Sequence, residues 1–202
     1  MKTILYNLYK AFKSKRARAM LLCLVSMFSL SAQTPRKDSG ANGLNIAQPV
    51  MLGFRVPEEF WSHEFMIFEN GKYTRQTLEK YRGKPLILDF WATWCTSCIA
   101  KFPKVDQFKQ IYRDRMNFIL VNSFDTDTQK IATVLTGEGT GQPTQTASIV
   151  NDVYLKQLFP HQSVPIYIWL DEYGRLQASS TANFLNDDQV RGMVERMKGG
   201  KQ

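Results

Sequence analysis

Hydrophobic residues along the chain form short runs and periodic segments that predict alternating strands and helices. The most continuous run, Leu86–Trp91, has Asp89 as its one charged member and predicts a buried central strand. A second apolar run at residues 116–122 predicts another buried strand. Between the two, apolar side chains recur every three or four positions, which predicts a helix over residues 99–112. Pro103 lies inside this segment, and we expect it to kink the helix.

The flanking segments continue the alternation. Residues 64–68 have a strand pattern, and Asn70-Gly71 after them is a strong hairpin signal. The Gly/Thr/Gln-rich segment 136–146 is expected to be a mobile insertion. Further short helices are predicted at residues 76–81, 127–135 and 152–159. The C-terminal part predicts a strand at 166–170, a turn at 172–175, a strand at 176–180 and a capped helix from Asn186 to about Lys198.

This order of elements predicts an α/β fold in which helices flank a central mixed β-sheet. A strand–helix–strand unit gives parallel strands, and the later strand–hairpin–strand–helix unit adds an antiparallel pair at one edge.

Charge is unevenly distributed along the chain. The net charge is +8, yet residues 1–32 carry six basic and no acidic side chains. The other residues hold 20 basic and 18 acidic side chains, a net charge of +2, without a basic stripe. We therefore expect no nucleic-acid partner.

Residues 1–32 have the organisation of a signal peptide. A basic segment ends at Arg18, an apolar run follows at 19–30, and the small residues Ser31-Ala32 come next. The apolar run has about 12 residues, fewer than the roughly 20 that a membrane-spanning helix needs. We expect export to the periplasm or cell envelope, with an uncleaved membrane anchor as the alternative. Residues 33–49 are predicted to be a flexible linker and 50–198 the folded domain.

The cysteines indicate redox chemistry. Cys23 lies in the apolar run of the predicted signal peptide, so the exported domain keeps Cys95 and Cys98. A disulfide between them closes a very small loop and stabilises little. The pair also follows a predicted strand and begins a predicted helix. A helix N-terminus stabilises a thiolate, which favours Cys95 as the attacking thiol and Cys98 as the resolving thiol.

Two structural alternatives compete with this interpretation. One is half of a zinc site, but a second CxxC is missing and the two histidines, His63 and His161, are far apart in sequence. The other is a purely structural disulfide. We predict neither a metal nor a cofactor.

The segment from Asp89 to Cys98, Asp-Phe-Trp-Ala-Thr-Trp-Cys-Thr-Ser-Cys, resembles the active-site segment of thioredoxins. Pro103 falls where thioredoxins kink the same helix, and Val164-Pro165 looks like their cis-proline loop. Together with Gly83-Lys84-Pro85 and the export signal, residues 50–198 resemble the TlpA/ResA group. The resemblance implies a thioredoxin-like fold.

The resemblance also implies roles for individual residues. Asp89 would be a buried carboxylate that relays the proton of Cys98, or else a purely structural carboxylate. Trp94 would shield the site beside Cys95, or else pack in the core. Pro165, if cis, would present the backbone of Val164 to an extended substrate, whereas a trans Pro165 would merely begin a strand.

One departure concerns the two residues between the cysteines. Thr96 and Ser97 stand where thioredoxin has Gly-Pro. Their hydroxyls could donate hydrogen bonds to the Cys95 thiolate and make the pair more oxidising, whereas the TlpA/ResA resemblance favours a reductase. The sequence leaves the direction of electron flow open.

These observations predict a thiol:disulfide oxidoreductase, more narrowly a protein-disulfide reductase, that acts on protein disulfides and dithiols. The resemblance implies that a membrane-embedded thiol donor resupplies its electrons. A thiol peroxidase and a redox-gated binding or sensing module are the alternatives. The sequence predicts no particular oligomeric state.

Overall fold

The computed structural model describes residues 47–181, 183 and 185–199, so the predicted signal peptide and residues 33–46 of the linker lie outside the described residues. Ala47, in the predicted linker, and Val50 both pack against a hydrophobic core. The N–H of Val50 also donates a hydrogen bond to the carbonyl of Leu158 at 2.9 Å.

A seven-stranded mixed sheet organises the domain, in the order β2-β1-β5-β4-β3-β6-β7. The central strand β3 pairs in parallel with β4 and antiparallel with β6, which confirms the predicted mixed sheet. The strands are β1 (Phe65–Glu69), β2 (Lys72–Gln76), β3 (Leu86–Trp91), β4 (Asn117–Asn122), β5 (Ser148–Ile149), β6 (Ile166–Leu170) and β7 (Leu176–Thr181).

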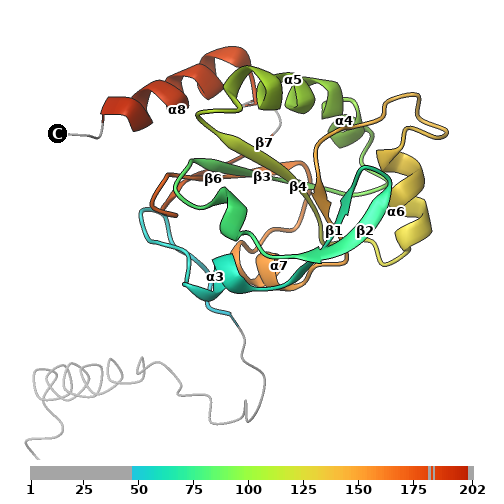
Figure 1. Ribbon diagram of the computed structural model, residues 1–202, viewed down its shortest axis with the longest axis horizontal. Helices are drawn as coiled ribbons and strands as arrows, with labels where there is room; N and C mark the ends of the chain where they lie inside the picture. Colours follow the sequence, from blue (N-terminus) through green and yellow to red (C-terminus); the bar gives the residue numbers. More distant parts are fainter. Residues whose placement is uncertain (1–46, 182, 184, 200–202) are drawn as a thin grey trace, which may run out of the picture. The chain divides into compact units, whose positions relative to one another are not determined.

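Helices cover both faces of this sheet. In Figure 1, α5 and α8 lie along one face, and α3 and α7 lie along the other. The helices are α3 (Glu59–Ser62), α4 (Thr96–Ile99), α5 (Phe102–Tyr112), α6 (Thr128–Leu135), α7 (Tyr154–Leu158) and α8 (Asp187–Gly199), with a 3₁₀ helix η2 (Glu79–Tyr81). None of the helices in the described part of the chain is long and apolar enough to cross a membrane.

Side chains of β3 alternate between two hydrophobic cores. Leu86, Leu88 and Phe90 belong to the core under α3 and α7. Ile87 and Trp91 belong to the core under α5 and α8. Because successive strand residues point to opposite faces, Asp89 lies on this second side with them. The pattern explains why the run lacks polar–apolar alternation, since the strand is buried on both faces.

The structure corrects three of the predicted elements. The expected kinked helix over 99–112 is interrupted, with α4 ending at Ile99 and α5 starting at Phe102. Pro103 therefore lies in the first turn of α5, where its missing N–H leaves no intrahelical bond unmade. Of the helix expected at 76–81, only η2 forms, because Gln76 ends β2. The helix expected at 152–159 is the shorter α7.

The predicted hairpin forms, and the end of the predicted insertion is anchored by hydrogen bonds. Asn70 and Gly71 have positive φ angles of 53° and 76° and connect β1 to β2 as predicted. The end of the 136–146 segment is fastened to α5, since the carboxylate of Asp106 accepts hydrogen bonds from Thr144, Gln145 and Thr146 at 2.6–3.0 Å.

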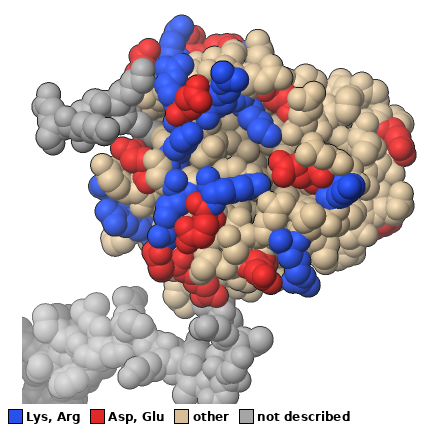
Figure 2. Space-filling view, viewed as in Figure 1, with Lys and Arg blue, Asp and Glu red and all other residues tan. Residues whose placement is uncertain are grey.

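Charged side chains on the face drawn in Figure 2 are interspersed in sign. Lysines and arginines lie beside aspartates and glutamates, and the side of the view where α6 lies is largely uncharged.

Candidate functional site

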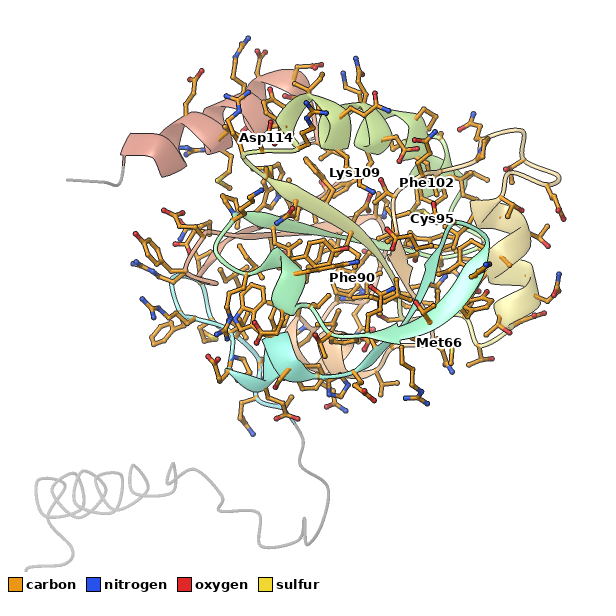
Figure 3. The ribbon with its side chains drawn as sticks, viewed as in Figure 1. Met66, Phe90, Cys95, Phe102, Lys109 and Asp114 are labelled. Carbon is orange, nitrogen blue, oxygen red and sulfur yellow. A yellow bond between two sulfur atoms is a disulfide. The ribbon has the colours of Figure 1, made fainter. Side chains whose placement is uncertain are left out.

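The two cysteines lie where the central strand ends and the first helical turn begins. Strand β3 ends at Trp91, a short loop follows, and Cys95 is the N-cap residue of α4. Figure 3 shows Cys95 at this junction. The Sγ of Cys95 accepts a hydrogen bond from the backbone N–H of Cys98 at 3.2 Å. An N-terminal N–H that points at sulfur favours negative charge there, so the local backbone stabilises a thiolate.

Cys95 and Cys98 form a disulfide, with an S–S distance of 2.04 Å and a Cα–Cα distance of 5.3 Å. Both side chains are buried in this oxidised state. Reducing the bond takes up two electrons and two protons and gives two thiols, so the pair can store and release two electrons.

Of the two residues between the cysteines, one has its hydroxyl close to the Cys95 sulfur. Both Thr96 and Ser97 are exposed. The Oγ of Ser97 lies 3.5 Å from the Sγ of Cys95, within hydrogen-bond distance for sulfur. Of the two predicted tuning residues, Ser97 is thus the one that the structure places against the sulfur.

Asp89 is almost completely buried, with 2% of its surface exposed. Its Oδ1 has no hydrogen-bond partner among the residues that the structure describes. Burial raises the pKa of this carboxyl well above its ordinary value, and the positive charge of Lys101 partly opposes the effect. A carboxyl with a raised pKa can hold a proton near neutral pH and give it up when its surroundings change.

The Val164–Pro165 peptide bond is cis. Strand β6 begins directly afterwards, and its first residue, Ile166, pairs with Phe90 of β3. The cis-proline loop therefore lies at the same end of the sheet as the cysteines. Val164 is partly buried and packs against both cores.

Trp94, directly before Cys95, lies at the surface. Its side chain is 58% exposed, so it does not pack in the core. The indole meets the ring of Phe124 edge to face, with 5.9 Å between centroids. An exposed aromatic ring next to a reactive cysteine is available to a partner, because it is not consumed by packing.

The loop after β4 supplies residues that the sequence interpretation missed. Phe124 supports Trp94, and the Nζ of Lys156 lies 3.6 Å from the centroid of the Phe124 ring. Asp125 accepts hydrogen bonds from Thr93, which precedes Trp94. The available signal was topological, because β3 and β4 are parallel and the loops after their carboxyl ends meet at one edge.

His161 approaches this cluster. Its Nδ1 lies 2.7 Å from the carbonyl oxygen of Phe159. Its ring contacts Phe90 and Phe124, with centroid distances of 4.4 and 5.5 Å. Partial burial lowers the pKa of the imidazole. The ring of Phe124 therefore lies between those of His161 and Trp94 in a chain of ring contacts.

Similarity to known proteins agrees with this geometry. A family model described as Redoxin matches residues 64–179. The chain is 30% identical over 112 residues to the thiol-disulfide oxidoreductase YkuV of Bacillus subtilis, covering 54% of this chain and 72% of that protein. It is 28% identical over 89 residues to the thiol:disulfide interchange protein DsbE of Haemophilus influenzae, covering 44% and 46% of the two chains.

The fold agrees as well. A crystal structure of a DsbE-type protein from Chlorobium tepidum superimposes with a TM-score of 0.57 at 18% identity, covering 72% of this chain and 99% of that one. The chain therefore belongs to the redoxin family and is a thioredoxin-like thiol-disulfide oxidoreductase of the TlpA/ResA group.

Proposed function

We propose that this oxidoreductase is a protein-disulfide reductase of the cell envelope, in which Cys95 attacks and Cys98 resolves. The observation that carries the division of labour is the N–H of Cys98, which points at the Sγ of Cys95 from the N-terminus of α4. This N–H stabilises a thiolate at Cys95. Among the described residues, no N–H donates a comparable hydrogen bond to the Sγ of Cys98.

The reaction begins with both cysteines reduced. The Cys95 thiolate attacks one sulfur of a substrate disulfide, and the other substrate sulfur leaves as a thiolate. Cys98 then gives its proton to Asp89 and attacks the Cys95 sulfur of the mixed disulfide. The bond between Cys95 and the substrate breaks, and the second substrate thiolate leaves. The substrate gains two electrons, and the Cys95–Cys98 disulfide of this structure is the product.

Substrate binding is proposed to use the surface around the cysteines. An extended substrate segment would pair with the backbone at Val164, beside the cis Pro165, in the manner of an added strand. The exposed indole of Trp94 would pack against a side chain that flanks the substrate cysteine.

Export and electron supply are part of the same proposal. The predicted signal peptide supports a location in the periplasm or cell envelope, and the TlpA/ResA membership supports a membrane-embedded thiol donor that reduces the disulfide again. The reduction potential of the Cys95–Cys98 pair tests whether the protein reduces or oxidises its substrates. A value near thioredoxin's, about −270 mV, fits a reductase, and one near −120 mV would identify an oxidant.

The exchange mechanism is tested by trapping. The Cys98→Ser variant should accumulate a mixed disulfide with a protein substrate, visible as a slower band on non-reducing gels. The matched Cys95→Ser variant should trap nothing, because it lacks the attacking thiol. Failure of Cys98→Ser to trap a reducible substrate, or equal trapping by both variants, would overturn the proposal.

A further inference from the structure

Two polar atoms that belong to neighbouring side chains in the core under α5 and α8 have no hydrogen-bond partner in the described part of the chain. They are the Oδ1 of Asp89 and the hydroxyl oxygen of Tyr167. Asp89 on β3 and Tyr167 on β6 are direct partners in the antiparallel register, so their side chains lie next to each other on the same face of the sheet. Tyr167 has 0% of its surface exposed.

Two other buried polar groups on the same face have hydrogen-bond partners. Two residues beyond Asp89, the indole N–H of Trp91 donates to the hydroxyl of Ser148 at 3.0 Å. Two residues beyond Tyr167, the indole N–H of Trp169 donates to the hydroxyl of Ser180 at 2.8 Å. A buried hydroxyl without a partner destabilises the fold, so a tyrosine at 167 is costly here where phenylalanine would not be.

Three groups from different elements bear on the Asp89 carboxyl. Tyr167 faces it from β6, Lys101 acts on it from the junction of α4 and α5, and Cys98 of α4 lies in the core on the same side of the sheet. Burial, with a smaller contribution from the nearby Asp89, raises the pKa of Tyr167 far above its ordinary value. Its hydroxyl therefore stays protonated and can act as a hydrogen-bond donor throughout the working pH range.

From this juxtaposition we propose that Tyr167 is a positioning residue for the proton relay, and that its hydroxyl donates a hydrogen bond to Asp89, directly or through one water, when that carboxyl is ionised. This inference rests on the proposed function, because it assumes that Asp89 accepts the proton of Cys98. A neutral carboxyl has little need of the donor, whereas a buried carboxylate requires one. The Tyr167 hydroxyl, which has no partner in the disulfide state, is thus available to donate to Asp89 in the reduced state.

The step balances within the protein. Ionised Asp89, hydrogen-bonded by Tyr167, takes the proton from the Cys98 thiol. The resulting thiolate attacks the Cys95 sulfur, and the substrate thiolate carries away the electron pair of the broken S–S bond. Without the Tyr167 hydroxyl the carboxylate is harder to form, so the relay becomes active only at higher pH.

The test replaces Tyr167 with phenylalanine in the full chain. The decisive readout is the pH titration of Asp89 in the reduced protein, followed by its infrared carboxyl band and assigned by its loss in Asp89→Asn. In Tyr167→Phe the midpoint should rise by about one pH unit, which corresponds to a tenfold loss of carboxylate on the rising part of the curve. The pH at which the rate of mixed-disulfide resolution is half-maximal should rise by the same amount.

The chain offers a matched control in Tyr154, whose hydroxyl is also buried without a partner among the described residues. Tyr154 packs against the core on the other side of the sheet, so Tyr154→Phe should leave the titration and the rate unchanged. In an Asp89→Asn background, Tyr167→Phe should add no further loss, because it acts through Asp89.

The outcomes separate the inference from the proposed function. An unmoved carboxyl titration in Tyr167→Phe overturns the inference, whether or not the wild type exchanges disulfides. An equal shift in Tyr154→Phe also overturns it, as does a further loss of rate in the Asp89→Asn background. If the titration shifts as expected while the wild type does not reduce protein disulfides, the inference about Tyr167 holds and the proposed function fails.

Discussion

Asp125 accepts two hydrogen bonds from Thr93, one from its backbone N–H and one from its hydroxyl, each 2.8 Å long. The side-chain amide of Asn122 donates to the same carboxylate, also at 2.8 Å. Thr93 belongs to the loop that leads to Cys95, and Asp125 belongs to the loop after β4. The carboxylate therefore ties the loop that leads to Cys95 to a second loop of the site.

Replacement of Asp125 with alanine should loosen this connection. The N–H and hydroxyl of Thr93 lose a charged acceptor, so we expect the free energy of unfolding to fall by about 2 kcal/mol. The rate of disulfide exchange should fall as well, because the loop no longer holds Cys95 in place. Urea unfolding and an insulin-reduction assay measure the two effects.

Asp114 provides the control for that experiment. It is an exposed aspartate whose ion pair with Arg113 lies at the surface, so Asp114→Ala should change stability by less than about 1 kcal/mol. Equal loss of stability in the two variants would show that the hydrogen bonds of Asp125 do not hold the loop.

The site shows which features are available from sequence and which are not. The cysteines, Asp89 and Pro165 were predicted because they lie in one short motif or beside a strand with a clear apolar pattern. Asp125 and Tyr167 were not, because their importance comes from pairing between strands that are far apart in the chain. Hydrophobic periodicity predicts which face a residue occupies, but near-continuous apolar runs such as β3 and β6 do not show which of their residues pair across the sheet.

The errors in the elements have physical causes of the same kind. A continuous three-and-four periodicity spans the break between α4 and α5, so the pattern predicted one helix. The role of Trp94 as a shield beside Cys95 is implied by the resemblance to thioredoxins and stays a prediction. Its ring is exposed, whereas Trp91 and Phe102 are buried in the core, where their rings meet edge to face with 5.2 Å between centroids.

Ser97 should tune the dithiol more strongly than Thr96. Its hydroxyl lies 3.5 Å from the Cys95 sulfur and can donate to the thiolate after reduction. Ser97→Ala should therefore raise the pKa of the Cys95 thiol and make the reduction potential about 30 mV more negative, which corresponds to one charge-assisted hydrogen bond of about 1.4 kcal/mol. Equilibration with glutathione buffers measures the potential. Thr96→Val is the matched control, and a shift as large as that of Ser97→Ala would contradict the assignment.

Trp94 should contribute to protein substrates but not to small disulfides. Because its ring is exposed and supported by Phe124, Trp94→Ala should lower kcat/KM for a protein disulfide about tenfold, in the range of interface aromatic residues. A small aromatic disulfide reagent should react with unchanged rate, since it needs only the dithiol. Tyr173→Ala is the control, because Tyr173 is an exposed ring after the end of β6 that is remote from the cis-proline loop. Equal losses with both substrates would indicate damage to the dithiol instead of lost substrate contact.

Asp152 should make stability depend on pH. Its carboxylate accepts a hydrogen bond from the N–H of Leu155, in the first turn of α7, at 2.8 Å, yet burial raises its pKa to about 6. A folded-state pKa above the unfolded value of 3.8 means that the folded state binds the proton more tightly. The resulting stabilisation is complete below about pH 4 and is lost as the pH rises through about 6.

The Asp152→Asn variant removes this dependence while it keeps an oxygen that can accept the N–H of Leu155. Relative to the wild type, its free energy of unfolding should therefore increase by about 1 kcal/mol between about pH 5 and pH 8. Urea unfolding at the two pH values measures this difference. Asp127→Asn is the matched control, because the carboxylate of Asp127 also accepts a first-turn N–H, that of Lys130 in α6, but is exposed to water. If Asp152→Asn differs from the wild type equally at both pH values, burial of Asp152 does not govern its ionisation.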